Sequence, residues 1–475
     1  MSFATREFFI FLPVVLLVYR TLHTRAQKFR FLLMASWFFY MWWNPWLIGI
    51  ILFTTVVDYA TGLLIEAATT AQRRRAWLCL SLTSNLGFLA FFKYSHFLLE
   101  NSLALARAAH WPVPEWTFNI VLPIGISFHT FQGMSYTIEV YRRQIRAVRS
   151  FADFALFIGF FPQLVAGPIV RASEFLPQMV TPPPVRSQDI EEGLHWFVVG
   201  LFKKVFIADQ LAQFVDTVFA HPELYDAVTH RWAVLAYAAQ IYCDFSGYSD
   251  MAIGCAKWFG FTLPRNFNLP YLAASITDFW RRWHITLSAW LRDYLYIPLG
   301  GNRRGAWRTY LNLLVTMTVC GLWHGAHWNY VLWGAYNGAL VAAHHAYDRV
   351  LHRRPWAERL RSRSAFTVVA TAGTLLLVLT GFVMVRSQSW SGCWLVQRSL
   401  VGWDAGDAGT RWVPVAVPAL VGLVAAGHAL GALGARTYRL LDLPPALRAA
   451  TYAIAVVLLV VLGPWSSNTF IYFQF

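Results

Sequence analysis

Charged residues are scarce in this chain of 475 residues, at 13% of the sequence, and acidic residues are scarcer than basic ones, 24 against 39. Hydrophobic residues make up 57% and aromatic residues 17%, which exceeds the apolar content of soluble globular proteins. No long polar interval separates the apolar runs, so the composition excludes a string of soluble domains. The sequence predicts an all-α, polytopic membrane protein, with one membrane domain over residues 1–475.

Cysteine is also rare, and its placement excludes two kinds of site. The chain has neither a CxxC pair nor a spacing typical of metal ligands, so we read its cysteines as small apolar side chains. We therefore expect no metal site and no bound cofactor. The five cysteines are Cys79, Cys243, Cys255, Cys320 and Cys393.

The net charge of +15 comes from short basic clusters between the apolar runs. This distribution is typical of the positive-inside rule, so we expect contact with membrane lipid and not with nucleic acid. If the spans alternate in direction, the clusters share the cytoplasmic side and both termini face outward. The clusters are Arg20, Arg25, Lys28 and Arg30; residues 73–75; Arg142, Arg143, Arg146 and Arg149; Arg303, Arg304 and Arg308; Arg349, Arg353, Arg354, Arg359, Arg361 and Arg363; and Arg436, Arg439 and Arg448.

Apolar runs recur along the whole chain, and several are shorter than the roughly 20 residues that cross a bilayer, which indicates tilted helices or a thinned membrane. Residues 151–171 and 261–300 are moderately apolar but broken by Pro, Gly and ionisable groups. We expect re-entrant or amphipathic elements there, lining an internal chamber. The predicted spans are 7–22, 31–43, 46–67, 77–97, 119–140, 195–219, 231–253, 310–325, 330–347, 365–386, 412–433 and 449–470.

The segment DFWRRWHITLSAWLRDY, residues 278–294, has an apolar stripe at helical spacing beside polar Asp278, Arg281, Arg282 and His284. One interpretation is an amphipathic helix on the cytoplasmic surface, with its arginines at lipid phosphates. The other is that these side chains face a cavity and hold an anionic or thioester-linked donor, because Arg binds phosphate through two parallel hydrogen bonds.

Two histidines lie in the apolar segment GLWHGAHWNYVLWG, residues 321–334. If the segment is helical, His324 and His327 share a face, and its glycines let neighbouring backbone approach closely. Three explanations remain open for the imidazoles: a structural hydrogen bond, a metal site, or a general base for acyl transfer. The metal site is the weakest of the three, since no HExxH motif is present.

Buried carboxylates follow an apolar run in YCDFSGYSDMAIG, where Asp244 and Asp250 need partners. We expect Arg or Tyr partners, drawn from residues 278–292, and a structural role. Asp58 has the same interpretation. His129 could line a cavity, but a lone polar residue on an apolar helix is more often a packing partner.

Taken together, seven motifs resemble the membrane-bound O-acyltransferase family and, within it, the membrane components of bacterial alginate O-acetylation. They are LPIGISFHTFQGMSY (122–136), FPQLVAGPIVR (161–171), KKVFIAD (203–209), YCDFSGYSDMAIG (242–254), NFNLPY (266–271), ITDFWRRWHITLSAWLRDYLYIPLGGNR (276–303) and GLWHGAHWNYVLWGAYNG (321–338). The core motifs fall within residues 120–340, and the C-terminal helices of residues 350–475 are less characteristic.

The resemblance implies a ring of tilted transmembrane helices with re-entrant elements around a central passage, in the bacterial inner membrane. It implies that His324 is catalytic, with His284 as the second motif histidine, and that His327 is not catalytic. The donor would be acetyl-CoA or an acyl carrier thioester, and a periplasmic acetyltransferase partner would modify an exopolysaccharide. The residues expected to bind the donor are Asp278, Trp280, Arg281, Arg282 and Trp323.

Two other functions are compatible with the sequence. A transporter of a sugar or acyl intermediate would also bury Asp and His, but it should show an inverted repeat with paired broken helices. The interrupted segments instead concentrate between residues 122 and 334. A non-catalytic scaffold for polysaccharide secretion would tolerate the loss of both His284 and His324.

Overall fold

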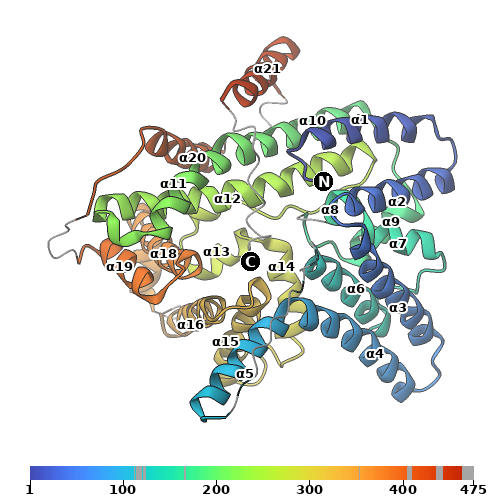
Figure 1. Ribbon diagram of the computed structural model, residues 1–475, viewed down its shortest axis with the longest axis horizontal. Helices are drawn as coiled ribbons and strands as arrows, with labels where there is room; N and C mark the ends of the chain where they lie inside the picture. The colour runs from blue at the N-terminus through green and yellow to red at the C-terminus, as the bar shows by residue number, and fades with distance from the viewer. Residues whose placement is uncertain are drawn as a thin grey trace. The chain divides into compact units, whose positions relative to one another are not determined.

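The computed structural model describes residues 1–111, 113, 120, 123, 125–164, 167–351, 354–403, 409–434 and 442–462. These residues form helices joined by short connections, with one isolated β-bridge between Tyr225 and Thr410 (Figure 1). The predicted all-α class is therefore confirmed for the described part of the chain. The helices pack as two compact units, residues 1–193 with 252–264 and residues 194–251 with 265–475. The prediction of one membrane domain over residues 1–475 stays a prediction.

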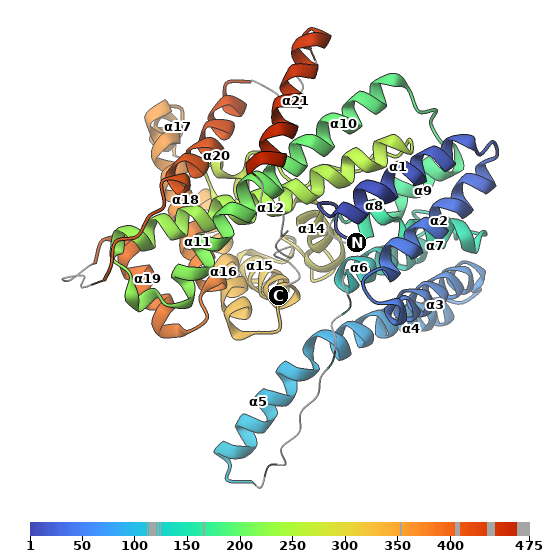
Figure 2. The ribbon, with the colours of Figure 1, turned by 45° about the horizontal axis from the view of Figure 1, so that its top comes forward.

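The first unit contains the N-terminal helices, and Figure 2 shows α5 continuing outward from α4 through a π-helical turn. Its helices α3, α4 and α6 pack against one another. The helices are α1 (Arg6–Thr21), α2 (Arg25–Met41), η1 (Pro45–Leu47), α3 (Ile48–Ala67), α4 (Ala71–Leu89), η2 (Ala90–Tyr94), α5 (Ser95–Ala108), α6 (Ile126–Tyr141), α7 (Phe151–Gly159), α8 (Phe161–Leu164) and α9 (Ala172–Val180).

Polar residues inside the first unit behave as the sequence suggests. Asp58 accepts hydrogen bonds from Ser81 Oγ at 2.6 Å and Asn85 Nδ2 at 2.8 Å, so its structural interpretation is supported. His129 is buried in α6, and neither ring nitrogen has a hydrogen-bond partner within the described structure. It is a packed side chain that receives no polar support there.

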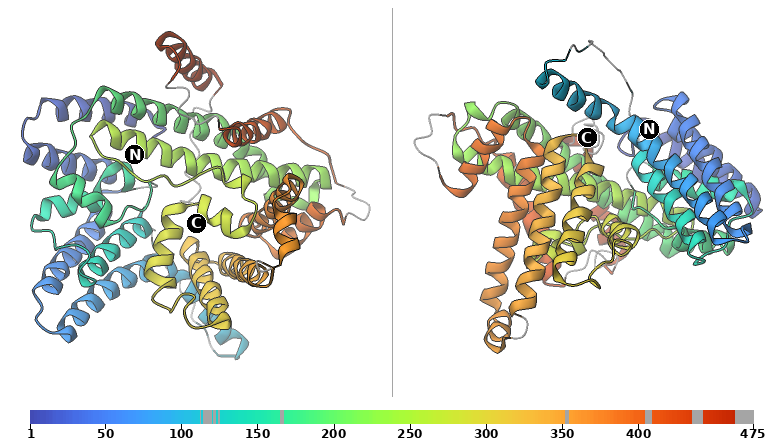
Figure 3. Two further views of the ribbon diagram at one scale, coloured as in Figure 1. Left: turned by 180° about the vertical axis from the view of Figure 1, so that it is seen from behind. Right: turned by 90° about the horizontal axis from the view of Figure 1, so that it is seen from below.

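The second unit begins within α10 and holds the rest of the chain. Here α15 and α16 form an antiparallel hairpin, and α18 packs on α16 (Figure 3). The helices are α10 (Ser187–Leu201), η3 (Phe202–Ala208), α11 (Asp209–Ala220), η4 (Pro222–Leu224), α12 (Ala227–Trp258), η5 (Pro270–Leu272), α13 (Ile276–Arg282), α14 (Ile285–Leu291), η6 (Arg292–Tyr296), α15 (Ala306–His324), α16 (Trp328–Leu351), α17 (Pro355–Arg361), α18 (Ser364–Arg386), α19 (Trp390–Val401), α20 (Ala416–Ala432) and α21 (Pro445–Leu462).

Membrane character is visible in what the helices expose. Many large apolar side chains are exposed, among them Ile10, Leu17, Val368 and Val369, which fits a protein solvated by lipid. Three helical segments in the described chain are long and apolar enough to cross a bilayer: Pro45–Ala67, Ala71–Ala108 and Ser364–Arg386. The other predicted spans form helices whose crossing stays a prediction, and residues 119, 121, 122, 124 and 463–470 of those spans lie outside the described structure.

Both segments predicted to be broken are indeed interrupted. Residues 151–164 form the short helices α7 and α8, and residues 270–296 form a series of short helical pieces.

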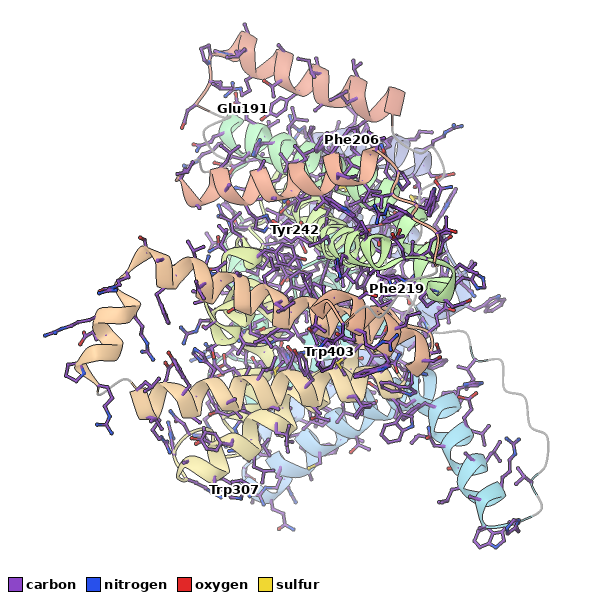
Figure 4. All side chains as sticks on the ribbon, turned by 90° about the vertical axis from the view of Figure 1, so that its left-hand side faces the viewer. Glu191, Phe206, Phe219, Tyr242, Trp307 and Trp403 are labelled. Carbon is purple, nitrogen blue, oxygen red and sulfur yellow. The ribbon has the colours of Figure 1, made fainter. Side chains whose placement is uncertain are left out.

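Figure 4 shows Trp307 projecting at the start of α15, whereas Tyr242 lies among the helices of the second unit. Because Trp307 stands next to the cluster Arg303, Arg304 and Arg308, it suits the interface between lipid and water.

Candidate active site

The turn between α15 and α16 places His324 at the end of its helix. A Cβ atom on Gly321 would lie 2.8 Å from the Cα of Gly334, so these glycines let the two helix backbones touch, as the sequence predicts. Gly325 is extended, with φ −160° and ψ 146°. The separate predicted spans 310–325 and 330–347 agree with this break, because α15 stops at His324 and a new helix starts at Trp328. His324 and His327 therefore do not share a helix face.

His327 consequently has a different setting from His324. It is exposed, its carbonyl accepts the Tyr330 N–H, and its Nδ1 accepts the Asn329 N–H at 3.2 Å. The side chain thus caps the start of α16, because the first N–H groups of a helix have no partners within it. His324 is buried, with 6% of its surface exposed.

His284 occupies a second helix interruption. Residues 278–294 do not form the single helix that the stripe predicts, since α13 ends at Arg282 and α14 begins at Ile285. The correction has a backbone cause: His284 adopts the left-handed region, with φ 43° and ψ 54°, and this conformation cannot continue a right-handed helix. The turn leaves the imidazole completely buried.

Asn266, which lies in a separate segment, forms hydrogen bonds with this turn. Its backbone carbonyl accepts the Ile285 N–H at 2.9 Å. Its side-chain Oδ1 contacts His284 Nδ1 at 3.1 Å, the Thr286 N–H at 3.3 Å and Thr286 Oγ1 at 3.0 Å. Its Nδ2 donates to Ser249 Oγ of α12 at 3.4 Å. The strained His284 conformation is therefore supported on its C-terminal side by bonds from one residue.

The two histidines face each other inside an aromatic enclosure. Their ring centroids lie 6.3 Å apart at 62°. Phe245 of α12 meets the His284 ring edge-on at 4.6 Å, and Trp333 of α16 meets the His324 ring at 5.2 Å. Trp323 lies 4.9 Å from His324 and 6.1 Å from His284. Buried imidazoles with apolar walls can accept and return protons where access of bulk water is restricted.

The other predicted site residues divide into two groups. Trp323 belongs to the enclosure, and Trp280 joins it through a 5.8 Å edge contact with Trp333. On α13, Arg282 Nε and Asp278 Oδ2 form an ion pair of 2.9 Å, and Arg281 is exposed. Donor binding by these three charged residues stays a prediction.

The carboxylates of Asp244 and Asp250 pair with lysines. The sequence predicted arginine or tyrosine partners from residues 278–292. Lys204 Nζ lies 2.8 Å from Asp209 and 2.6 Å from Asp244, all nearly inaccessible to solvent. Lys203 Nζ lies 2.7 Å from Asp250. The partner prediction is wrong because η3, which carries both lysines, lies against α12. The π-helical turn follows directly on α10 and leads into α11.

No group of three or more His, Cys, Asp or Glu side chains suited to a metal occurs in the described portion of the chain. The expectations of no metal and no bound cofactor stay predictions. Sequence reasoning missed Asn266, Phe245 and Trp333. All three lie in quoted motifs, yet no spacing within the sequence indicates that they meet at the same pair of histidines.

A helical, lipid-exposing chain with two enclosed imidazoles fits a membrane enzyme that transfers acyl groups. Comparison with known families agrees, since residues 139–378 match the model of the membrane-bound O-acyltransferase family. The chain belongs to this family and is an O-acyltransferase.

Individual relatives are similar over most of the chain. It is 41% identical over 417 residues, 86% of this chain and 80% of the relative, to the probable alginate O-acetylase AlgI of Azotobacter vinelandii. It is 39% identical over 375 residues, 73% of this chain and 70% of the relative, to the peptidoglycan O-acetyltransferase of Helicobacter pylori. The teichoic acid D-alanyltransferase of Bacillus subtilis is 26% identical over 284 residues, 56% of this chain and 68% of the relative.

Proposed function

We propose that this enzyme moves acetyl groups from a cytoplasmic thioester, acetyl-CoA, across the bacterial inner membrane for O-acetylation of an exopolysaccharide. Relatives named for alginate and for peptidoglycan both serve carbohydrate polymers, which offer hydroxyl groups as acyl acceptors. The observation that carries the proposal is the enclosed pair His284 and His324, 6.3 Å apart between ring centroids. Acyl transfer to a hydroxyl needs a base of this kind.

His324 acts as the general base. It takes the proton from the acceptor hydroxyl while that oxygen attacks the carbonyl carbon of the acetyl thioester. The C–O bond forms, the C–S bond breaks, and the sulfur leaves as a thiolate that receives the proton back from the imidazolium. His284 holds the second imidazole of the pair and orients His324 and the reacting groups.

The aromatic walls limit a competing reaction. Water attacks thioesters in place of the acceptor wherever it reaches the acyl carbon, and a dry enclosure suppresses such hydrolysis. Trp323, Trp333 and Phe245 supply walls around the imidazoles. Trp280 extends this surface through Trp333.

Donor binding falls to α13. The guanidinium of Arg281 is accessible, and Arg282 exchanges its Asp278 partner for a donor phosphate at little cost, because the pair is partly exposed. Arg suits phosphate because its planar fork makes two parallel hydrogen bonds. These contacts would hold acetyl-CoA at its phosphates.

The proposed reaction needs the donor to enter from the cytoplasm and the acceptor to enter from the periplasm. A ring of tilted helices surrounds a passage, the basic clusters face the cytoplasm, and both termini face the periplasm. The acceptor hydroxyl enters from the periplasmic side, and a periplasmic acetyltransferase partner passes the acetyl group to the polymer. Membrane lipid covers the exposed apolar side chains of the helices.

The experiment measures ester-bound acetate on the host's exopolysaccharide, with protein abundance followed by immunoblot. His324→Ala should abolish acetylation at normal abundance. His327→Asn is the matched control, because His327 is exposed and caps a helix, and Asn keeps an acceptor at that position. Normal acetylation by His324→Ala would refute the proposal, whereas loss in both variants would point to the turn rather than to the base.

A further inference from the structure

Asn266 determines which nitrogen of His284 carries the proton. The side-chain atom of Asn266 that faces the turn lies 3.3 Å from the Thr286 N–H, a group that can only donate. That atom is therefore the amide oxygen, because the amide nitrogen would set two donors against each other. The opposite end of the amide agrees, since Nδ2 donates to Ser249 Oγ.

His284 Nδ1 lies 3.1 Å from the same oxygen. An amide oxygen accepts hydrogen bonds and cannot donate them, so Nδ1 must carry the hydrogen. In the neutral imidazole the lone pair is then on Nε2, because only one of the two ring nitrogens is protonated. The backbone N–H of Thr286 thus sets the orientation of the Asn266 amide, and that amide sets which nitrogen of His284 is protonated.

We propose that Asn266 is a positioning residue that holds His284 as its Nδ1–H tautomer and so leaves the lone pair of the neutral ring on Nε2. The inference rests on the proposed function, in which His284 works beside His324. It adds a residue that touches neither acetyl donor nor acceptor and that acts through the imidazole it binds.

The backbone bond strengthens this assignment. The carbonyl of Asn266 accepts the Ile285 N–H at 2.9 Å, and Asn268 N–H donates to the carbonyl of Arg282 at 2.9 Å. These bonds bracket His284, whose left-handed conformation is strained for a residue other than glycine. One short segment thus fixes both where the ring points and which tautomer it adopts.

Among the residues that the structure describes, the groups that face the ring are Phe245 of α12, Trp323 and His324 of α15, and Asn266. His324 is the titratable member of this set. His324 keeps its side chain in every variant used below, so the variants differ only at residue 266 or its partner Ser249. A change in pH profile among the variants then reports on the contact between residue 266 and His284.

The test compares Asn266→Ala, Asn266→Asp and Ser249→Ala in the full-length protein, assayed by thiol release from acetyl-CoA in inverted membrane vesicles of the native host. Asn266→Ala should lower the rate about 10- to 100-fold at normal abundance, the range typical of lost orienting partners. Asn266→Asp should retain more activity, because a carboxylate accepts the same two N–H groups. Ser249→Ala removes only the Nδ2 partner and should stay near the wild-type rate.

The acid limb of the pH profile separates positioning from folding. A carboxylate at 266 favours the imidazolium, so the neutral ring forms at higher pH and the limb should move upward in Asn266→Asp. A structural role alone would lower the rate in both Asn266 variants without that shift. Wild-type rate in Asn266→Ala, or an unshifted limb in Asn266→Asp, would overturn the proposal.

A second measurement needs no Asn266 variant to fold. ¹⁵N-histidine NMR of the purified full-length protein, with His284→Gln to assign the signal, should show the proton of the neutral ring on Nδ1. A proton on Nε2 would overturn the proposal. Wild-type thiol release by His284→Gln would instead refute the catalytic role of the pair, so the two failures are distinguishable.

Discussion

The imidazole rings of His284 and His324 lie 6.3 Å apart between centroids, although one follows α13 and the other ends α15. α15 ends at His324, and His284 is the N-cap of α14, two residues after the end of α13. The pair is thus assembled by two helix ends, and each ring is held by aromatic neighbours. Its members should act as a unit.

We expect His324→Ala and His284→Ala each to lower thiol release from acetyl-CoA, with His324→Ala costing about 10²- to 10⁴-fold. The double variant should be about as slow as His324→Ala alone, since groups that act together lose most of their effect when one is removed. Initial rates in membrane vesicles measure this. Losses that multiply would show that the histidines act independently.

Removal of Lys204 should destabilise the second unit. Lys204→Met removes the cation that lies 2.8 Å from Asp209 and 2.6 Å from Asp244, and breaking a buried pair costs about 3–5 kcal/mol. Lys203→Met is the matched control, because Lys203 and its partner Asp250 are more accessible. Thermal unfolding in detergent should show a larger loss for Lys204→Met. Equal losses would contradict the burial argument.

Gly321→Ala should also destabilise, by about 1–3 kcal/mol, because its Cβ would lie 2.8 Å from the Cα of Gly334. Gly373→Ala in α18 provides the opposite case, since a Cβ there has nothing within 4 Å. Alanine in an open helical position stabilises by about 0.5–1 kcal/mol relative to glycine. Melting temperatures of the two variants should move in opposite directions, and a shared direction would argue against backbone contact at Gly321.

Acid should weaken the start of α12. Burial acts to raise the pKa of Asp226, but hydrogen bonds from Thr229 and Arg411 outweigh it and hold that pKa below its usual value. A depressed folded pKa contributes stability above the unfolded pKa, and this stability is lost as pH falls through the folded pKa. Asp226→Asn should therefore show a flatter decline of melting temperature in acid. An unchanged decline would show that Asp226 does not contribute to the acid sensitivity of the fold.

The sequence indicated the helical class and the broken segments, because apolar periodicity, Pro and Gly are local signals, whereas the family resemblance indicated both histidines. It could not indicate that helix 278–294 breaks at His284, since the break depends on a left-handed residue held by Asn266 from another segment. Gly325 was read as a packing glycine, but the chain is extended there, so His324 and His327 lie on either side of a helix break.

The sequence also did not indicate which residues distant in the chain pair with the buried polar groups. Asp244 was expected to meet Arg or Tyr, yet Lys204 contacts it, because a π-helical turn aims the lysine at α12. Trp333 and Phe245 look like ordinary apolar helix residues in sequence. Their place beside the histidines appears only when three helices pack together.

The most direct test of acyl transfer uses acetyl-CoA labelled in its acetyl group, supplied to the cytoplasmic face of sealed inverted vesicles from the native host. Wild-type vesicles should release free CoA thiol and gain ester-bound label on polysaccharide, while His324→Ala vesicles of equal protein content should do neither. Equal thiol release and labelling by His324→Ala would contradict the catalytic role. Acetylation that proceeds without thioester consumption would contradict the acyltransferase mechanism itself.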